Sequence, residues 1–313
     1  MVNLHTMISS LILLVIGLVL LGRGADVFVD GAVSVARRFN IPSIIIGTTL
    51  VAIGTSAPEA GISIVAALRG SDGVSIGNII GSNITNIFLI LGLTAVIGSV
   101  PIHQNTKRYE LPFVGLITLL LCLIGLWFGT VSRMAALVFL ALFVSFILYT
   151  ICMARKSTEP VQEFKKASIT KTIVMIIAGI AALIIGSDLT VNSAIEIANY
   201  LHVSERVIGL TVVALGTSLP ELVVCVIAAI KHEYDMAIGN IVGSNIFNIL
   251  FVLGSAALIK PLPFNTAFLT DGAIAMLAIT MLMIFTAKNS RIRRFGGIMF
   301  LLSYVAYVLY LVA

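Results

Sequence analysis

Two glutamates occur at positions where a charged side chain is costly. Residues 51–60 read VAIGTSAPEA, so Glu59 follows a glycine, two hydroxyl residues and a proline inside a long apolar stretch. A charge at a bilayer centre costs at least ~2.5–3.5 kcal/mol, and Pro58 breaks a helix because it cannot donate a backbone hydrogen bond. The same combination recurs at residues 216–221, GTSLPE, which end at Glu221. A break and a carboxylate that occur together twice predict a polar site inside an apolar protein.

Such a break can support the binding of a hard cation. Pro58 frees the carbonyl four residues earlier, and we expect Thr55 or Ser56 to cap the half-helix that begins beyond it. Glu59 would lie in the first turn, where the helix dipole favours a carboxylate. Carbonyls freed around residues 52–55, together with a carboxylate in a water-lined gap, are the ligands of a hard-cation site.

The alternative is a kinked helix whose glutamate is protonated or paired with a basic residue. Neither motif carries a lysine or arginine, and Arg23 is the only lysine or arginine that lies more than three residues inside a predicted span. Two carboxylates without a basic partner favour a bound cation over this alternative.

The composition is that of a membrane protein. The 313 residues are 59% hydrophobic and 11% charged, with a mean hydropathy of +1.13, whereas soluble domains have about 25% charged residues. The net charge of +5 comes from Lys and Arg in short segments between apolar runs, which is typical of membrane-protein loops and does not indicate nucleic-acid binding. The three cysteines lack metal-ligand spacing and predict no disulfide framework.

Ten apolar segments are long enough to span a bilayer, so we predict an all-α polytopic membrane protein. The first and sixth are longer than a bilayer needs and should be tilted. The predicted spans are 7–36, 43–68, 73–98, 110–129, 133–154, 169–200, 205–230, 235–259, 265–287 and 295–312.

The chain consists of two homologous halves. IGTTLVAIGTSAPE at 46–59 recurs as IGLTVVALGTSLPE at 208–221 with 10 of 14 positions identical, and both motif pairs are separated by 162 residues. Each half has five spans, an odd number, so the second half starts on the opposite side of the membrane. We therefore predict inverted repeats at 1–154 and 169–313, joined by a linker at 155–168. Inverted repeats with broken helices place a site near the membrane midplane.

Positive charges predict the orientation of the chain. One set of loops holds fourteen Lys and Arg residues, and the opposite set holds four. Because cytoplasmic loops carry the excess of positive charge, the linker is predicted to be cytoplasmic and both termini are predicted to lie outside.

A second repeated motif adds neutral oxygens. We expect Asn78 and Asn240 to be structural and the deeper residues to line the gap, although interhelical hydrogen bonding alone is an alternative. Glycines in the same motif have G-x-x-x-G spacing and favour close helix packing. The motifs are IGNIIGSNITNI at 76–87 and IGNIVGSNIFNI at 238–249, and each places two asparagines and a serine on one helical face: Asn78, Ser82, Asn86 and Asn240, Ser244, Asn248.

These ligands favour calcium and sodium. The motifs hold no thiolate or histidine, which disfavours zinc, copper and iron. Two bidentate carboxylates and the carbonyls of Thr55 and Thr217 would supply about six oxygens, and Ca²⁺ takes about six to eight. Two negative charges match one Ca²⁺ or two Na⁺, and hydroxyls and amides can hold further Na⁺. A site that holds either ion set, but not both, is that of an exchanger.

At these residues the chain resembles the calcium/cation antiporter superfamily. GTSAPE and GTSLPE, with GNIIGSNITNI and GNIVGSNIFNI, resemble its paired alpha repeats, and the entire chain looks like a prokaryotic sodium/calcium exchanger. The resemblance implies a transporter of the cell membrane, not an enzyme, that couples sodium entry to calcium extrusion by alternating access. Calcium/proton and potassium-dependent sodium/calcium exchange are alternatives. A channel or an intramembrane hydrolase fits less well, because the site is closed at the midplane and lacks a nucleophile with a base.

The resemblance also implies an ion-ligand set of six residues in each half. Several exchangers of the family have aspartate at the position of Asn248, so this site holds only two carboxylates and its sodium stoichiometry stays open. No cofactor is implied; calcium and sodium ions and the lipid bilayer are the expected partners, without nucleic acid or a required protein partner, for a chain able to act as a monomer. The implied ligands are Ala52, Thr55, Ser56, Glu59, Ser82 and Asn86, and Ala214, Thr217, Ser218, Glu221, Ser244 and Asn248.

Overall fold

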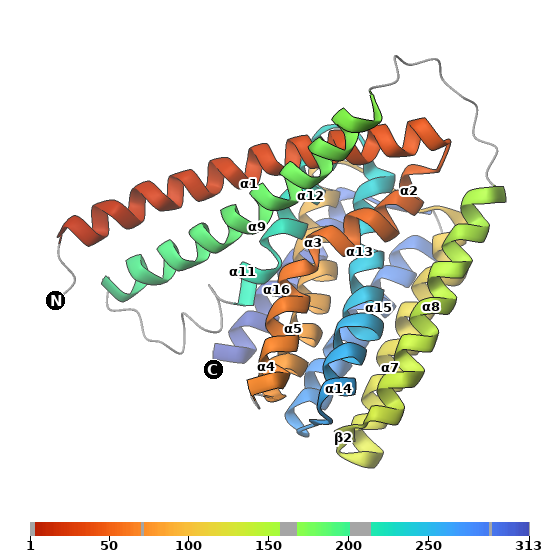
Figure 1. Cartoon of the computed structure of the whole chain (residues 1–313). Helices are drawn as coiled ribbons and strands as arrows, with labels where there is room; N and C mark the ends of the chain where they lie inside the picture. The colour runs from red at the N-terminus through yellow and green to blue at the C-terminus, as the bar shows by residue number, and fades with distance from the viewer. Residues whose placement is uncertain (1–3, 70–71, 157–167, 201–213, 288–289, 313) are drawn as a thin grey trace.

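The computed structural model describes residues 4–69, 72–156, 168–200, 214–287 and 290–312, which are almost entirely helical (Figure 1). The first half contains α1 (Leu4–Phe39), α2 (Ser43–Ile46), α3 (Ala52–Thr55), α4 (Ala57–Arg69), α5 (Asp72–Thr85), α6 (Gly92–Ile97), α7 (Leu111–Phe128) and α8 (Arg133–Lys156). The second half contains α9 (Ile169–Tyr200), α11 (Ala214–Thr217), α12 (Leu219–Ile230), α13 (Tyr234–Phe247), α14 (Gly254–Ile259), α15 (Ala267–Ala287) and α16 (Arg294–Val312). Described π-helical segments are η1 (Gly47–Val51), η2 (Asn86–Leu91), η3 (Thr106–Glu110) and η5 (Asn248–Leu253).

The helices confirm a polytopic membrane protein. Within the described residues, eight helices are long and apolar enough to cross a membrane, and the segments Ser43–Thr55 and Ala57–Arg69 form a further span with a bend of 48°. These correspond to nine of the ten predicted spans. The remaining one, 205–230, is described only from Ala214, so the count of ten lies partly outside the described residues.

Helices α1 and α9 lie side by side and antiparallel, inclined to the other helices (Figure 1). Small residues form their contact: a β-carbon added at Gly24 would lie 2.8 Å from that of Ala182, and one at Gly186 would lie 2.9 Å from the carbonyl oxygen of Gly17. Such residues let two backbones approach closely, which is how helices commonly associate in membranes.

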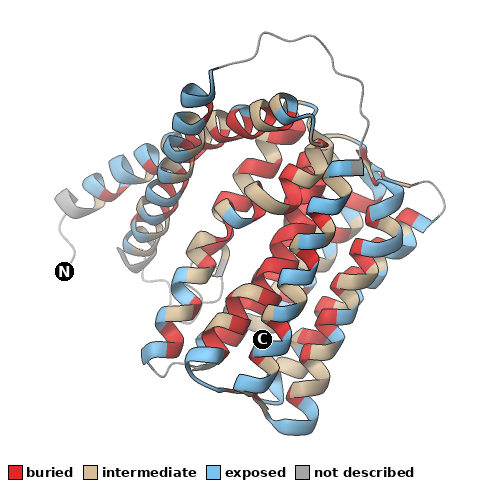
Figure 2. Ribbon diagram, turned by 45° about the vertical axis from the view of Figure 1, so that its right-hand side comes forward, coloured by how far each residue is buried: buried red, intermediate tan, exposed pale blue. Residues whose placement is uncertain are grey.

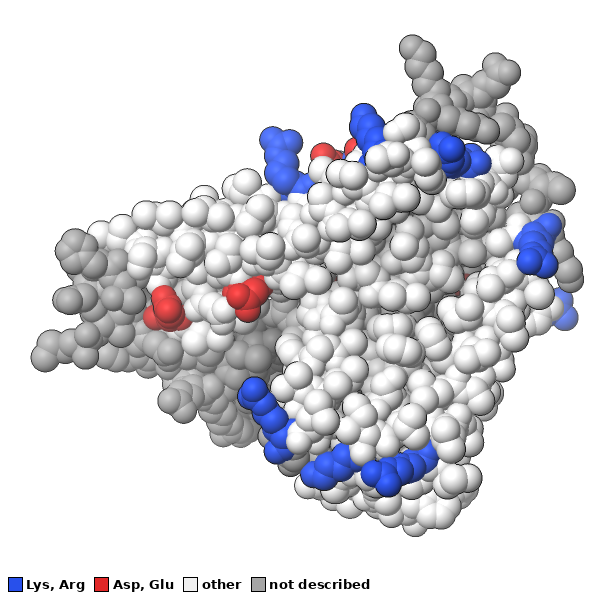
Figure 3. All heavy atoms as spheres, in the orientation of Figure 1, with Lys and Arg blue, Asp and Glu red and all other residues white. Residues whose placement is uncertain are grey.

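Helices α5 and α13, which carry the second motif, lie in the buried centre of the protein. Figure 2 shows buried residues concentrated in the central helices and exposed residues on the outer faces. Large apolar side chains such as Leu116 and Leu309 are exposed on those faces, as expected where lipid is the solvent. Figure 3 shows Lys and Arg gathered near the upper and lower edges of one face, with a broad surface free of both between them.

Two short strand pairs connect the halves reciprocally. Strand β1 (Val100–Pro101) pairs with β4 (Arg291–Ile292), and β2 (Thr130–Val131) pairs with β3 (Leu262–Pro263). Each pair joins one loop from each half. The sequence predicted the two loops of each pair on the same side of the membrane, so this pairing agrees with the predicted alternation of the chain.

Among the residues that the structure describes, close packing through glycine occurs in only one of the two copies of the second motif. A β-carbon added at Gly243 would lie 2.5 Å from the carbonyl oxygen of Thr48 and 2.8 Å from the β-carbon of Ala52. At Gly81, the equivalent position in the first half, an added β-carbon meets no described residue within 4 Å. Helix α13 therefore lies directly against the broken helix of the first half, and α5 makes no such contact with the described part of the second half.

This difference predicts unequal effects of the same substitution. Gly243→Ala should lower the thermal unfolding midpoint of the purified protein in detergent, because overpacking against backbone costs about 1–3 kcal/mol. Gly81→Ala is the matched control and should leave that midpoint near the wild-type value. Equal midpoints for the two variants would contradict the packing seen here.

Candidate functional site

The two helix breaks bring both glutamates to one buried site. Each break is a single residue, Ser56 between α3 and α4 and Ser218 between α11 and α12. Ser56 Oγ donates to Glu221 Oε1 over 2.8 Å, and Ser218 Oγ donates to Glu59 Oε1 over 3.2 Å. Both glutamates are 1% exposed. The serine of each half therefore holds the carboxylate of the other half.

The hydroxyls of the second motif join the same cluster. Ser56 Oγ lies 3.0 Å from Ser244 Oγ, and Ser218 Oγ lies 3.3 Å from Ser82 Oγ. The pairing is again reciprocal between the halves. Four of the predicted hydroxyl ligands thus surround the two carboxylates.

Several buried oxygens at this site have no hydrogen-bond partner among the residues that the structure describes. They are Glu59 Oε2, Glu221 Oε2, Asn86 Oδ1 and Asn248 Oδ1. A buried oxygen without a partner is costly, and no ion pair involves either glutamate among the residues that the structure describes. Two carboxylate and two amide oxygens, all acceptors, form a donor set suited to a hard cation.

The described residues contain no group of three or more His, Cys, Asp or Glu side chains able to hold a metal ion. A cation here would therefore rely on two carboxylates and on neutral oxygens. This is a donor set for calcium and sodium and not for zinc, copper or iron.

Asn78 and Asn240 make the contacts expected of structural residues. Asn240 Oδ1 accepts from the Thr55 hydroxyl over 3.1 Å, and Asn78 Oδ1 accepts from the Thr217 hydroxyl over 3.3 Å. Asn78 also donates to Ser63 Oγ over 3.0 Å. These bonds occupy both threonine hydroxyls. The groups of Thr55 and Thr217 that remain for an ion are therefore their backbone carbonyls.

The serine cap expected for each half-helix is absent in the second half. Ser218 precedes α12 but forms no side-chain cap, and its hydroxyl donates to Glu59 of the other half. The carbonyl of Ala52 accepts the amide of Ser56 over 3.0 Å, so an ion could use only its second lone pair. The repeat partner Ala214 begins the described part of the second break, and its side chain lies outside the described residues.

Sequence reasoning missed Asn83. Its amide oxygen accepts from Asn248 Nδ2 over 3.1 Å, and its own amide nitrogen donates to the carbonyl of Asn245 over 3.2 Å. Asn83 therefore accepts the hydrogen bond from the side-chain nitrogen of Asn248, and the side-chain oxygen of Asn248 stays without a described partner. The signal was available, since G-S-N recurs in both motifs, but Asn83 lies one position beyond the polar stripe.

The two asparagines at the ends of the stripe also start π-helical segments. Asn86 begins η2 and Asn248 begins η5. Segments of this kind frequently occur at functional sites, and nothing in a simple helical periodicity would have indicated them.

The site is more accessible from one half than from the other. Asn240 and Ser244 are completely buried, whereas Asn78 is partly exposed. A cavity of about 420 Å³ opens beside α5, with Asn78, Ser82 and Thr217 among its lining residues. Since Ser82 contacts the serine that holds Glu59, the cavity reaches the edge of the carboxylate cluster.

Comparison with known proteins places the chain in a family. A sequence model described as "Sodium/calcium exchanger protein" matches residues 9–152 and 171–313. The inner membrane protein YrbG of Escherichia coli is 38% identical over 82% of this chain and 81% of its own. The sodium/calcium exchanger MaX1 of Methanosarcina acetivorans is 30% identical over 96% of this chain and 98% of its own.

A solved structure supports the same assignment. The sodium-calcium exchanger NCX_Mj, soaked with Na⁺ and Sr²⁺, superposes with a TM-score of 0.86 at 36% identity and covers 97% of this chain and 99% of its own. Relatives of this kind are transporters and not enzymes. The chain is a multi-pass membrane antiporter that belongs to the prokaryotic branch of the sodium/calcium exchanger family.

Proposed function

We propose that this protein exchanges sodium for calcium across the cell membrane by alternating access and extrudes calcium from the cytoplasm. The observation that carries the proposal is the set of unpartnered oxygens on Glu59, Glu221, Asn86 and Asn248, which lie on elements of both halves. An oxygen-lined site with two negative charges suits one Ca²⁺ or a set of Na⁺.

Calcium would be held mainly by the two carboxylates. Each glutamate has one oxygen fixed by a serine and one oxygen free. Binding both oxygens of each carboxylate, with the carbonyls of Thr55 and Thr217, gives about six ligands. The family resemblance supports the same assignment for these four residues.

Sodium would use the neutral oxygens around the same carboxylates. The proposed ligands are the backbone of Ala52 and Ala214, the hydroxyls of Ser56, Ser82, Ser218 and Ser244, and the amides of Asn86 and Asn248. Because calcium and sodium would share Glu59 and Glu221, occupation by one set excludes the other, which is the condition for exchange.

Orientation follows the positive-inside rule. We assign the 155–168 linker to the cytoplasm and both termini to the outside. The cavity beside α5 then opens outward, because it is lined by residues next to the loops predicted outside, such as Val74 and Leu311. Transport of ⁴⁵Ca²⁺ into proteoliposomes, driven in turn by outward Na⁺, K⁺ or H⁺ gradients, tests the coupling ion.

A further inference from the structure

The cavity beside α5 has an acidic residue on its wall that the proposed ion site does not use. Asp271, on α15, lines the cavity together with Tyr304 and Tyr307 of α16. The Tyr307 hydroxyl donates to Asp271 Oδ1 over 3.4 Å. No basic side chain is among the described residues that line this cavity.

The cavity joins this carboxylate to the ion site. Its lining runs from Asp271 and the tyrosines to Asn78, Ser82 and Thr217, and Ser82 is one hydrogen-bond step from the serine that holds Glu59. A cation that enters from this end would pass Asp271 before it reaches Glu59. A negative charge in a low-dielectric cleft raises the local concentration of cations.

The repeat places a comparable pair at the other end of the protein. Glu110 at the end of η3 and Tyr149 of α8 line a second cavity of about 430 Å³. Glu110 is buried and Tyr149 is partly buried, and among the described residues Glu110 Oε2 and the Tyr149 hydroxyl have no hydrogen-bond partner. Asp271 and Tyr307 follow Glu110 and Tyr149 by 161 and 158 residues, close to the repeat distance of 162. The second cavity is not lined by the central polar stripe, and Arg108 also faces it.

We propose that Asp271 is an entry subsite for Ca²⁺ and Na⁺ on the outer face, the face onto which the α5 cavity opens. This inference rests on the proposed exchange function and assigns a residue outside the central ligand set. Electrostatic enrichment depends exponentially on ion charge, so removal of one carboxylate should weaken Ca²⁺ access by roughly the square of its effect on Na⁺.

The test compares the two faces of the membrane. In right-side-out and inside-out vesicles, Asp271→Asn should raise the apparent KM for external Ca²⁺ about 10-fold and for external Na⁺ about 3-fold at low ionic strength. The KM on the internal face should stay at the wild-type value, and the external effect should shrink in high salt. Glu110→Gln is the matched control and should leave the external KM unchanged.

Several outcomes would overturn the subsite. They are an unchanged external KM in Asp271→Asn, equal changes on both faces, or equal changes for the two ions. If the wild-type protein exchanges Na⁺ for Ca²⁺ in the same vesicles, such a result rejects only the subsite. If the wild-type protein carries no Na⁺-driven Ca²⁺ flux, the proposed function itself fails.

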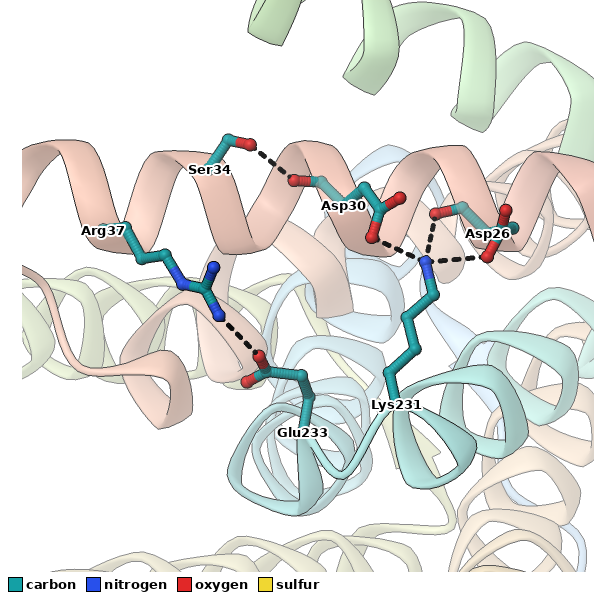
Figure 4. A network of polar contacts seen from close by, with 6 residues as sticks. All are labelled: Asp26, Asp30, Ser34, Arg37, Lys231 and Glu233. Atoms are coloured by element: carbon teal, nitrogen blue, oxygen red, sulfur yellow. Dashed lines mark hydrogen bonds and ion pairs between the residues drawn. The ribbon is translucent and has the colours of Figure 1, made fainter. Parts of the chain in front are cut away.

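A separate observation concerns ion pairs that join the ends of the two halves. Figure 4 shows Lys231, in the turn between α12 and α13, between two carboxylates of α1. Its Nζ lies 2.7 Å from Asp26 Oδ1 and 2.6 Å from Asp30 Oδ1. Next to it, Arg37 of α1 lies 3.5 Å from Glu233. These contacts tie α1 to the end of the broken helix in the second half.

The repeat supplies an equivalent pair that is not formed. Arg69 and Asp188 occupy the positions of Lys231 and Asp26 in the opposite halves, at the same separation of 162 residues. No ion pair joins them in the described part of the chain, and both are exposed. Asn192 occupies the position equivalent to Asp30 in the other half, so the second pair has one carboxylate fewer.

We infer that the two ion pairs are alternating latches. The Lys231 latch stabilises the conformation seen here, in which the α5 cavity is open, and an Arg69–Asp188 latch stabilises the opposite conformation. Removing one latch should therefore shift the population of the two conformations in a direction that depends on which latch is lost.

Thiol labelling tests these latches. Val308 lines the α5 cavity, so Val308→Cys, in a background with serine at the three native cysteines, reports its accessibility to a membrane-impermeant maleimide added outside. Lys231→Met, or Asp26→Asn with Asp30→Asn, should slow labelling several-fold. Asp188→Asn is the matched control and should label at least as fast as the parent. Labelling of both Lys231→Met and the double variant at the parent rate would reject the latches.

Discussion

Replacing Glu59 or Glu221 by glutamine is expected to abolish calcium transport. Each glutamate supplies half of the negative charge that would balance Ca²⁺, and removing one partner of a buried charge pair costs about 2–5 kcal/mol. Transport should therefore fall at least about 30-fold. Initial rates of ⁴⁵Ca²⁺ uptake into proteoliposomes measure this directly.

Folding should survive these substitutions. Glutamine keeps an oxygen that can accept the hydrogen bond from Ser56 or Ser218. The purified variants should remain monodisperse, but the rise in unfolding midpoint that Ca²⁺ binding gives the wild-type protein should disappear. A variant with wild-type flux, or with the full Ca²⁺-induced rise, would reject the assignment of that glutamate.

Transport is expected to respond strongly to membrane voltage. With Asn248 neutral, Glu59 and Glu221 are the only carboxylates of the proposed site, so Ca²⁺ leaves it neutral and three Na⁺ leave one net positive charge. Exchange of three Na⁺ for one Ca²⁺ moves one charge per cycle, worth about 2.3 kcal/mol per 100 mV. At equilibrium this corresponds to about a 50-fold change in the Ca²⁺ gradient.

The structure supports the larger sodium set. The four serine hydroxyls and the amide oxygens of Asn86 and Asn248 offer neutral ligands for a third sodium ion. Proteoliposomes clamped with valinomycin and K⁺ should take up Ca²⁺ faster when the inside is positive and Na⁺ leaves. Uptake that ignores the imposed potential would indicate exchange of two Na⁺ for one Ca²⁺.

The sequence was sufficient to predict the fold class and to pair the two glutamates in one candidate site. Glu59 and Glu221 could be paired because the repeat is inverted and because each glutamate follows a helix-breaking proline. This reasoning needs only local chemistry and the parity of the spans, and the reciprocal contacts of Ser56 and Ser218 agree with it.

The roles of individual polar groups were harder to predict, because they depend on which partner is nearby. A serine before a half-helix is ordinarily a cap, but Ser218 has a carboxylate of the other half within reach and donates to it instead. Asn83 was missed for the same reason: its function is to hold Asn248, a residue of the other half.

The difference between the halves could not be predicted from the repeat. Gly81 and Gly243 occupy equivalent positions in nearly identical motifs, yet only Gly243 is closely packed by residues that the structure describes. If the chain works by the proposed alternating access, it has two conformations of similar free energy, and a sequence that encodes both does not indicate which one is adopted. On that proposal, the asymmetry of the cavity beside α5 belongs to one of the two conformations.

Sodium/calcium exchange can be tested by measuring ⁴⁵Ca²⁺ uptake into proteoliposomes that contain the purified protein, with outward gradients of Na⁺, K⁺ or H⁺ imposed one at a time. We expect uptake with the Na⁺ gradient, none above background with K⁺ or H⁺ alone, and none for the Glu59→Gln and Glu221→Gln proteins under any gradient. Uptake driven by H⁺ or K⁺ but not by Na⁺ would contradict sodium/calcium exchange.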